Sequence, residues 1–252
     1  MARIITVATE KGGVGKTTIA TGIASIGASR GLRTLLIDLD PQGNAGHALG
    51  AALSGAATAD VISRRTVQPQ AVRPTLHVLV GGPALRSAEV QAAHPDDLGV
   101  ALKSLQGAYD LMVVDTPPGD MRLVQLGLCA ASSVVVPIEA HPFSVQGGIR
   151  IIEQVRRFQE RGRQPPELVL VMSALDIRRR DDRDLETLLT AKFPDLKRIA
   201  IPQDAALAGA GRDRLPLIET APKARGTQAL QALCDALGLV GLAHADGDGH
   251  GP

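Results

Sequence analysis

The sequence predicts an α/β fold with a mainly parallel, doubly wound sheet and helices on both faces. Short runs rich in Val, Ile and Leu alternate along the chain with segments of helical periodicity. This alternation is typical of strand–helix–strand units, whose parallel strands are buried on both faces. Two of the apolar runs end in Asp, at the strand ends where doubly wound folds bind their ligands. The chain has 252 residues, of which 44% are apolar, enough for a sizeable core.

The first strand is predicted over residues 4–8, and it leads through the glycine-rich segment 9–18 (TEKGGVGKTT) into a helix that begins at Lys16. The glycines let the backbone turn tightly and direct consecutive N–H groups inward, and the helix N-terminus adds about half a positive charge there. This geometry predicts a nest for phosphate oxygens. Lys16 is then expected to reach the β- and γ-phosphates, and the Thr17 hydroxyl to complete a Mg²⁺ shell.

A second buried strand is predicted over residues 33–38, after Gly31 ends the first helix. It ends in Asp38, and Asp40 follows two residues later, so both carboxylates are placed at the ligand-binding edge of the sheet. Residues 45–75 are Ala-rich and contain two prolines, and they predict a short helix and a connecting loop.

The middle of the chain repeats this alternation. A strand over residues 76–80 is broken by a Gly-Gly-Pro sequence, and helical patterns follow at about 84–92 and 96–106. The strand 111–115 ends in Asp115 and runs into a proline-stiffened loop. Asp115 is therefore expected at the same edge of the sheet as the phosphate nest.

The remaining elements complete the sheet. Strands are predicted over residues 133–138, 168–173 and 197–201, and helices over about 149–161, 184–192 and 223–239. We expect residues 1–242 to form one domain and residues 243–252, which are glycine-rich and lack apolar periodicity, to be disordered.

Composition narrows the possible classes of protein. The formal net charge is +1, so any contact with nucleic acid must come from a local basic patch. Cys129 and Cys234 are far apart without metal-ligand spacing, which favours core cysteines in a reducing cytosol. No apolar span approaches the ~20 residues of a transmembrane helix. Aromatic residues make up 2% of the chain, which disfavours base stacking on single strands.

The glycine loop departs from the ordinary phosphate-loop pattern, because Glu10 occupies the position of its first glycine. The variant KGGxGKTT carries a second lysine, Lys11, and resembles the deviant Walker A loop of the ParA/MinD family of ATPases, which have a P-loop NTPase fold. The strand 111–115 and its Pro-Pro loop resemble that family's Walker B strand and second switch, and residues 38–44 resemble its first switch. The resemblance covers nearly the whole chain and is weakest in residues 45–75 and 203–216.

The resemblance implies roles for individual residues. Asp40 would orient the attacking water, Asp38 would support the metal shell, Asp115 would hold Mg²⁺ through a water, and Lys11 would reach the phosphates of a partner subunit. The expected catalytic residues are Lys11, Lys16 and Asp40; the expected nucleotide-binding residues are Gly12, Gly13, Val14, Gly15, Lys16, Thr17, Thr18, Pro202 and Asp204; the expected metal-site residues are Thr17, Asp38 and Asp115. The adenine side departs from the family, with Gln203 where the family usually has Arg.

The function that the resemblance implies is that of a ParA-like ATPase. Such a protein forms an ATP-sandwich homodimer, binds double-stranded DNA non-specifically, and positions a plasmid, chromosome locus or other cargo. Its slow hydrolysis is stimulated by a ParB-like or other adaptor, and it is cytoplasmic and nucleoid-associated. The candidate DNA-binding residues are Arg178, Arg179, Arg180, Arg212, Arg214 and Arg225. A solvated surface of mixed charge is the alternative interpretation of these arginines.

Two other functions remain open from the sequence. A MinD-like membrane-associated ATPase needs a C-terminal amphipathic helix with basic and bulky apolar faces, and this tail is acidic and glycine-rich. An enzyme or iron–sulfur carrier on the same fold, such as dethiobiotin synthetase or the nitrogenase iron protein, is the other. Cluster carriers need suitably spaced cysteines, and the two cysteines of this chain do not provide them.

Overall fold

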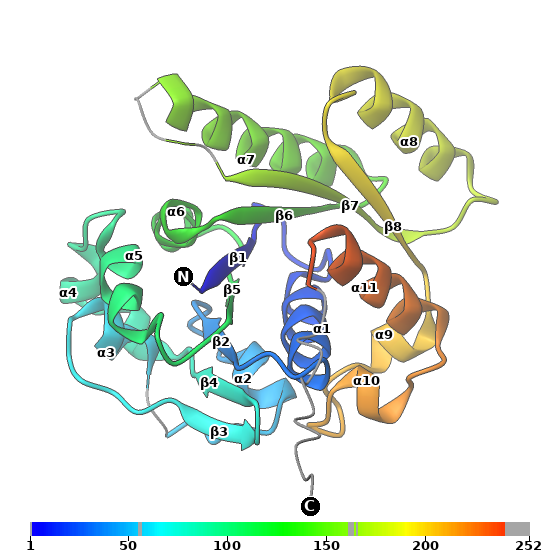
Figure 1. Cartoon of the computed structure of the whole chain (residues 1–252). Helices are drawn as coiled ribbons and strands as arrows, with labels where there is room; N and C mark the ends of the chain where they lie inside the picture. Colours follow the sequence, from blue (N-terminus) through cyan, green and yellow to red (C-terminus); the bar gives the residue numbers. More distant parts are fainter. Residues whose placement is uncertain (1, 55–56, 161–163, 165, 240–252) are drawn as a thin grey trace, which may run out of the picture.

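One twisted sheet runs through the centre of the molecule and is covered by helices on both faces (Figure 1). The computed structural model describes residues 2–54, 57–160, 164 and 166–239. Within these residues eight strands are hydrogen-bonded in the order β3-β4-β2-β5-β1-β6-β7-β8. The strands are β1 (Arg3–Val7), β2 (Thr34–Asp38), β3 (Gln70–Arg73), β4 (Leu76–Leu79), β5 (Leu111–Asp115), β6 (Ser133–Ile138), β7 (Glu167–Leu175) and β8 (Lys197–Pro202).

Every neighbouring pair of strands is parallel except β3 and β4, which are antiparallel. The predicted α/β class and its mainly parallel sheet are therefore confirmed, and all seven predicted strands are present. β1 lies between β5 and β6, with β2 beyond β5. The carboxyl ends of β1, β2 and β5 are in register, with Asp115 opposite both Val7 and Asp38.

Two layers of helices cover the sheet. The first layer contains α1 (Lys16–Ser29), α2 (Asn44–Ala48), α9 (Ala205–Gly209), α10 (Leu217–Thr220) and α11 (Arg225–Ala236). The second contains α3 (Thr58–Ile62), η1 (Pro83–Arg86), α4 (Ala88–Gln91), α5 (Asp97–Leu102), η2 (Lys103–Leu105), α6 (Met121–Ala130), α7 (Pro142–Glu160) and α8 (Arg180–Lys192).

Alternate side chains of each central strand point into opposite layers, as the two-residue repeat of a strand requires. In β1, Ile5 and Val7 pack in the core formed with α1 and α11, whereas Ile4 packs in the core formed with α3 to α6. Both sets are buried. This two-sided burial explains why the strands are continuous apolar runs in the sequence instead of alternating ones.

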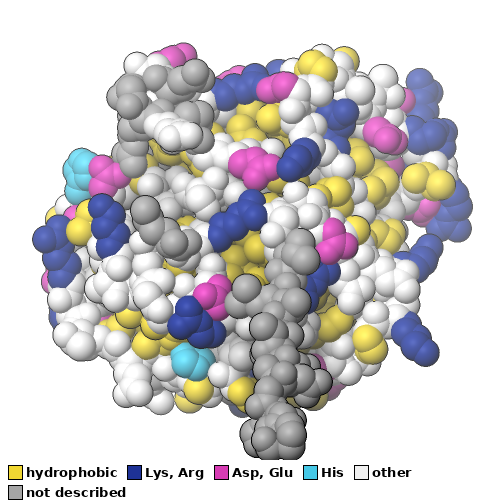
Figure 2. Space-filling view, in the orientation of Figure 1, with side chains coloured by type: hydrophobic (Ala, Val, Ile, Leu, Met, Phe, Trp, Pro, Cys, Tyr) yellow, Lys and Arg dark blue, Asp and Glu magenta, His cyan; other side chains and the backbone are white. Residues whose placement is uncertain are grey.

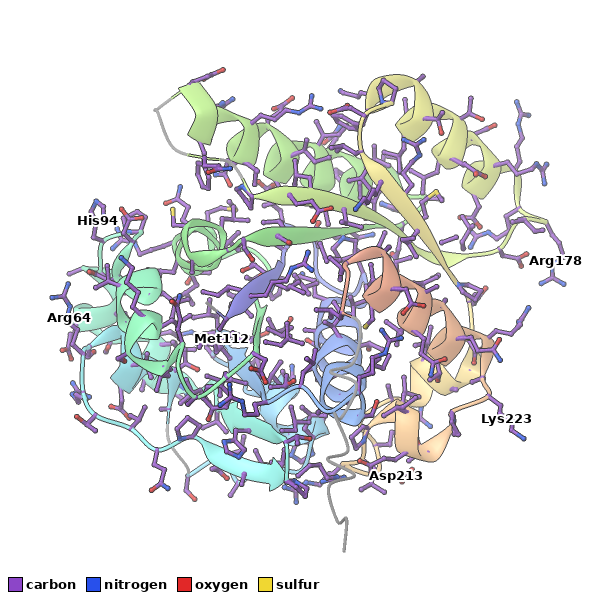
Figure 3. All side chains as sticks on the ribbon, viewed as in Figure 1. Arg64, His94, Met112, Arg178, Asp213 and Lys223 are labelled. Carbon is purple, nitrogen blue, oxygen red and sulfur yellow. The ribbon has the colours of Figure 1, made fainter. Side chains whose placement is uncertain are left out.

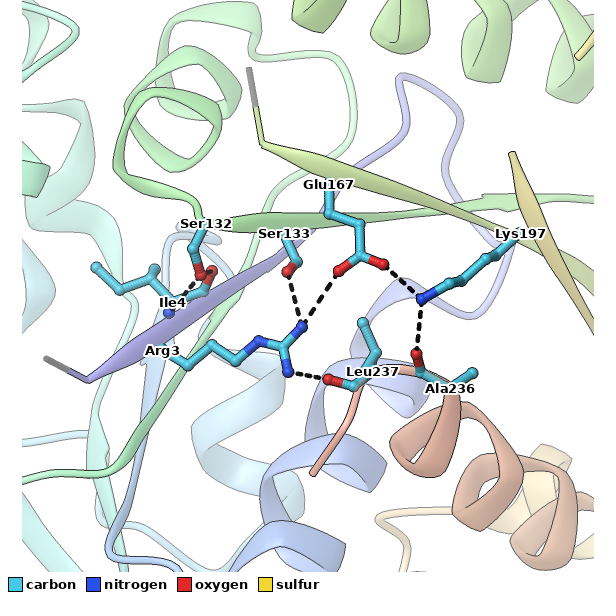
Figure 4. A network of polar contacts seen from close by, with 8 residues as sticks. All are labelled: Arg3, Ile4, Ser132, Ser133, Glu167, Lys197, Ala236 and Leu237. Carbon is cyan, nitrogen blue, oxygen red and sulfur yellow. Dashed lines mark hydrogen bonds and ion pairs between the residues drawn. The ribbon is translucent and has the colours of Figure 1, made fainter. Parts of the chain in front are cut away.

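A polar network at the amino ends of the central strands holds the C-terminus of α11 (Figure 4). The Arg3 guanidinium donates to the carbonyl oxygen of Leu237, and also to Ser133 Oγ at 3.2 Å and Glu167 Oε2 at 3.3 Å. Lys197 Nζ donates to Glu167 Oε1 at 2.7 Å and to the carbonyl oxygen of Ala236 at 3.3 Å. Two cations thus satisfy carbonyls that the helix end leaves unpaired.

Several element boundaries differ from the prediction. The expected short helix and loop of residues 45–75 is wrong, because α2, α3 and the edge strand β3 form there. β3 escapes prediction because it has only four residues, all partly exposed or exposed, between two prolines. The expected helices at 84–92 and 96–106 are broken into short α-helices and 3₁₀ turns.

Two helices of the C-terminal half, α7 and α8, begin earlier than predicted. α7 starts at Pro142, where proline suits the first helical position, and α8 starts at Arg180 with Asp181 and Asp182 in its first turn. The last helix covers residues 225–236 of the predicted 223–239. The predicted disorder of residues 243–252 concerns a segment outside the described residues. Within the described part, no helix is both long and apolar enough to cross a membrane.

Candidate functional site

The glycine-rich loop closes around the N-terminus of α1. Gly13 and Gly15 have φ values of 81° and 82°, in the left-handed region that favours glycine, and Gly15 is the residue preceding the helix. Ser173 from β7 donates its hydroxyl to the carbonyl oxygen of Val14 at 3.0 Å. The predicted strand–loop–helix arrangement is therefore present. A strand distant in sequence holds the back of the loop.

Lys16 lies almost entirely below the surface, with an exposed fraction of 6%. Its ammonium donates to the carbonyl oxygen of Lys11 at 2.6 Å, across the loop. Burial lowers the pKa of Lys16 from its usual value, while the nearby Asp115 and Asp40 carboxylates oppose that shift. The site thus places one cation against the backbone of the glycine loop and near two acids, an arrangement suited to phosphate bound with a divalent cation.

Asp115 is the acid best placed for that cation. The Thr17 hydroxyl donates to Asp115 Oδ2 at 2.8 Å, whereas Asp115 Oδ1 is buried without a hydrogen-bond partner. Burial, followed by the negative charge of Asp38, raises the pKa of Asp115 well above its usual value. A buried acceptor without a partner is unfavourable. A hydrated Mg²⁺ beside Thr17 and Asp115 would satisfy that oxygen, so these residues fit the expected ion.

Asp38 organises the loop that follows β2. Its Oδ1 accepts from the backbone N–H of Asp40 at 2.9 Å, and its Oδ2 accepts from Ala45 N at 3.0 Å and Gly46 N at 3.1 Å. Burial raises the pKa of Asp38 to about 6, against the opposing effect of these hydrogen bonds. The structure thus shows Asp38 as the anchor of the Asp40 loop, next to Asp115 in the strand register. Its role in the metal shell remains a prediction.

Asp40 is held at the same edge of the sheet. Its Oδ1 accepts from the backbone N–H of Gln42 at 2.8 Å, and its carbonyl oxygen accepts from Gly43 N at 2.9 Å. Gly81, the residue second after β4, lies against it: a Cβ at Gly81 would stand 2.1 Å from the Asp40 carbonyl oxygen. The backbone of one loop therefore rests directly on the backbone of the other, and only glycine permits this approach.

A cavity of about 350 Å³ opens beside the phosphate nest, towards the end of β8. Its lining includes Gly13, Gly15, Thr18, Glu139, Ser173, Ala174, Pro202, Gln203 and Asp204. The structure thus brings the predicted adenine-side residues Pro202 and Asp204 to the phosphate loop. The carboxylate of Asp204 caps α9 by accepting from Ala206 N at 2.8 Å, and it accepts from Gly226 N at 3.0 Å. These backbone bonds lower the pKa of Asp204 and fix the wall of the cavity.

The front of the loop contacts the segment that joins β6 to α7. Lys11 Nζ lies 3.8 Å from Glu139 Oε2, and Arg150 Nη1 lies 2.8 Å from Glu10 Oε2. The sequence reasoning did not assign roles to Glu139, Arg150 or Ser173. Glu139 directly follows β6, so its position after a predicted strand could have marked it as a candidate for the site. For Arg150 and Ser173 the sequence offers no comparable signal.

The candidate DNA-binding arginines are distributed over two regions. Arg178 and Arg225 line one groove of about 680 Å³ at the ends of β7 and β8. Arg178 bonds to Asp176, Arg179 lies 3.9 Å from Asp182, and Arg180 lies 3.5 Å from Asp184. Figure 3 places Arg178 at the edge of the molecule, and Figure 2 shows Lys and Arg side chains gathered along this edge.

Arg214 belongs to the other region. Its guanidinium donates to the carbonyl oxygens of Gly50, at 3.2 Å, and Ala51, at 3.0 Å, after α2. Its neighbour Asp213 lies well away from Arg178 in Figure 3. Arg225 therefore joins the Arg178 groove, whereas Arg214 is engaged elsewhere, with Arg212 two residues before it. The assignment of all these residues to DNA stays a prediction.

Comparison with known proteins agrees with this geometry. Residues 2–168 match the family model AAA_31, described as AAA domain. The chain is 38% identical over 156 residues to the chromosome partitioning protein ParA of Myxococcus xanthus, covering 58% of this chain and 55% of that protein. The chain thus spans about half the length of that relative. The chromosome-partitioning ATPase Soj of Thermus thermophilus is 34% identical to the chain over 244 residues. This match covers 92% of this chain and 94% of the Soj chain.

Solved structures show the same fold. The complex of Cyanothece McdA, carrying a D38A substitution, with ATP superposes with a TM-score of 0.80 at 20% identity. That match covers 94% of this chain and 96% of the McdA chain. At this identity the likeness concerns the fold alone.

Proposed function

The chain belongs to the ParA/MinD family of ATPases, and on that premise we propose that it binds Mg²⁺ and ATP at the loop 9–18 and hydrolyses ATP to position a cargo. The observation that carries the proposal is the convergence of Lys16, Thr17 and Asp115 at the N-terminus of α1. The backbone amides and Lys16 would bind the phosphates, and Thr17 with Asp115 would hold the metal. A bound Mg²⁺ would neutralise charge that develops on the transferred phosphoryl group.

Asp40 is the residue that we assign to the attacking water. Its carboxylate follows β2 directly, and Asp38, Gln42 and Gly81 fix its loop. Carboxylates are weak bases, so orienting a water is the role we assign to Asp40 instead of full proton abstraction. Hydrolysis is therefore expected to be slow until a partner improves the geometry.

The ATP-bound form is proposed to be a homodimer with two nucleotides sandwiched between the subunits. Lys11 is at the front of the loop with 29% of its side chain exposed, and it would cross to the phosphates of the partner's nucleotide. Cations that act from a second subunit raise phosphoryl-transfer rates by ~10³ or more. Dimerisation would thus couple assembly to turnover.

The cargo-positioning role follows from the partition ATPases among the relatives. We propose that the dimer binds double-stranded DNA without sequence preference, and that a ParB-like or other adaptor stimulates hydrolysis and releases it. The support for DNA binding is the group Arg178, Arg179, Arg180 and Arg225 at one edge of the molecule. A dimer presents this group twice, so ATP would control affinity by doubling the number of phosphate contacts.

The first experiment measures nucleotide binding by titration calorimetry. Lys16→Ala removes the buried ammonium and is expected to weaken ATP binding by roughly 10- to 100-fold or more, the worth of a hydrogen bond to a charged group. Lys103→Ala, a substitution of an exposed lysine at η2, serves as the control and should bind ATP normally. Wild-type affinity in the Lys16→Ala protein would contradict the phosphate-loop assignment.

The second experiment separates assembly from hydrolysis. Asp40→Ala should bind ATP, hydrolyse little and accumulate as a dimer in light scattering, whereas Lys11→Ala should bind ATP yet hydrolyse little. An Asp40→Ala protein that stays monomeric in saturating ATP would refute the sandwich dimer. Hydrolysis at the wild-type rate would instead move the catalytic role to another residue, with Asp38 next.

A further inference from the structure

Lys11 forms its ion pair within its own chain. Its ammonium lies 3.8 Å from Glu139 Oε2, and the two side chains are 29% and 28% exposed. Glu139 also lines the cavity beside the phosphate nest, next to Gly13. Glu139 therefore contacts the lysine and also borders the cavity. The backbone N–H of Glu139 donates to the Ser144 hydroxyl at 2.9 Å, and this bond fixes the backbone of Glu139.

A second pair fixes the backbone of the same loop. Arg150 of α7 bonds to Glu10 at 2.8 Å, and α7 approaches so closely that a Cβ at Gly147 would stand 3.4 Å from Glu10 Cβ and 3.6 Å from Lys11 N. Lys16 adds its bond to the Lys11 carbonyl oxygen. The Lys11 backbone is thus held from two sides, while its side chain is held through Glu139.

We infer that Glu139 restrains Lys11 within its own chain and thereby sets the protein concentration at which the ATP-bound dimer forms. This inference rests on the proposed function, in which Lys11 crosses to the partner's phosphates. A single ammonium cannot keep close contact with Glu139 and also reach across the interface. Each subunit must therefore break its Lys11–Glu139 pair as the dimer assembles, which makes Glu139 a positioning residue that opposes assembly.

The size of the effect follows from the exposure of the pair. Partly exposed ion pairs contribute about 0.2–1 kcal/mol, or roughly 1.4- to 5-fold in an equilibrium constant. Two pairs break in each dimer, so the dimer dissociation constant is expected to fall by roughly 2- to 25-fold when the carboxylate is neutralised. Salt screens such pairs, with a Debye length of about 10 Å at 0.1 M and 3 Å at 1 M. The difference between variant and wild type should therefore shrink as ionic strength rises.

The test uses the full chain with Mg²⁺ and a saturating non-hydrolysable ATP analogue, AMPPNP, so that changes in nucleotide affinity do not enter. Sedimentation equilibrium measures the dimer dissociation constant of wild type, Glu139→Gln and Glu139→Asp across a salt series. Glu139→Gln should dimerise more tightly at low salt and approach wild type near 1 M. Glu139→Asp keeps the charge and should lie closer to wild type.

The matched control is Glu10→Gln. This substitution neutralises a carboxylate in the loop that carries Lys11, but it breaks the pair with Arg150 and leaves the Lys11–Glu139 pair in place. It should not tighten the dimer. A wild-type protein that dimerises with AMPPNP, together with an unchanged or weaker Glu139→Gln dimer, would overturn this inference and leave the proposed function intact. A wild-type protein that stays monomeric at all concentrations would overturn both.

Discussion

At the scale of single residues, the site depends on close backbone contacts as much as on charged groups. Gly81 is the clearest example, because the space for its side chain is occupied by the loop that carries Asp40. A Cβ there would meet the Asp40 carbonyl oxygen at 2.1 Å and Asp38 Oδ1 at 2.8 Å. The second residue after β4 thus positions the loop that carries the carboxylate assigned to the attacking water.

Gly81→Ala is expected to lower the free energy of unfolding by about 1–3 kcal/mol, the usual range for overpacking, and to displace Asp40. A shift of about 1 Å in a group that orients a reactant can cost about 100-fold in rate. Chemical denaturation and ATP hydrolysis assays measure the two effects. Gly107→Ala is the control, since nothing lies within 4 Å of its Cβ position. Equal stability and activity in the two variants would show that Gly81 does not constrain the Asp40 loop.

Arg178 illustrates a second residue-scale effect, competition between a protein carboxylate and an external phosphate. Its guanidinium bonds to both oxygens of Asp176, and this contact lowers the pKa of Asp176 to about 2. Arg178→Ala should raise that pKa towards the ordinary value of 3.8, as followed by the carboxyl carbon shift in an NMR titration. Arg180→Ala should leave it in place.

The sign of the pH effect follows from linkage. The pKa of Asp176 is lower in the folded chain than in the unfolded one, so its contribution to stability is present above about pH 4 and is lost as the pH falls towards 2. The Arg178 side chain is 88% exposed, although that of Asp176 is only 16% exposed, so solvent screens the pair and the contribution is small. An Asp176 that titrates near its ordinary value in the wild-type protein would contradict the contact.

At the scale of elements, α11 runs from the cavity beside the phosphate nest to the amino ends of β1, β7 and β8. Its first turn meets the Asp204 carboxylate through Gly226 N, and its last carbonyls accept from Arg3 and Lys197 (Figure 4). The Glu167 carboxylate accepts from both Arg3 and Lys197 and thereby holds the two side chains in place. The helix is therefore fixed at both ends, which keeps Arg225 in the groove that it shares with Arg178.

Arg3→Ala removes the cation that bonds to Leu237 and Glu167, and we expect a loss of about 1–2 kcal/mol in the free energy of unfolding, because a helix-end carbonyl loses its partner. Urea unfolding should show a lower midpoint with an unchanged slope. The control is Arg180→Ala, whose pair with Asp184 is 86% and 68% exposed and should change stability by less than about 0.5 kcal/mol. An Arg3→Ala protein as stable as this control would mean that the network does not hold α11.

At the scale of the whole molecule, the described surface is neither uniformly basic nor acidic, so DNA binding must depend on where charges gather. Arg178 and Arg64 lie on opposite sides of the molecule (Figure 3). This separation allows the group Arg178, Arg179 and Arg180 to be compared with the pair Arg64 and Arg65 on the other side. Only the Arg178 side shares a groove with residues Pro202 and Gln203 of the nucleotide cavity.

The triple variant Arg178→Ala/Arg179→Ala/Arg180→Ala should weaken ATP-dependent binding to unrelated duplexes alike and flatten the salt dependence. Each phosphate contact contributes a slope of about −0.9, so each arginine position that loses its contact in both subunits changes the slope by about 2 units. Fluorescence anisotropy across a salt series measures this. The Arg64→Ala/Arg65→Ala protein should keep the wild-type slope. Unchanged affinity and slope in the triple variant would remove this group from the DNA site.

The sequence by itself determined the fold class and predicted the residues of the phosphate site. Central strands that are buried on both faces must be largely apolar, so β1, β2, β5 and β6 could be found without knowing their partners. The loop 9–18 could be found locally, since its glycines, Lys16 and Thr17 stand in one continuous segment of the chain. Asp115 and Asp40 were found because parallel strands end at a common edge, whatever their order.

Only the tertiary structure decided which distant residues complete the site. Ser173 is 159 positions from Val14, and Glu10 is 140 positions from Arg150, and these contacts depend on the placement of β1 beside β6 and of β7 next to it. Strand order is set by the packing of the whole core and leaves no periodic signal in the sequence. For the same reason the sequence did not predict the Lys11–Glu139 pair or the contact of Gly81 with Asp40. In each case two loops are in contact because their strands are close together in the sheet, and only the folded structure shows the strand order.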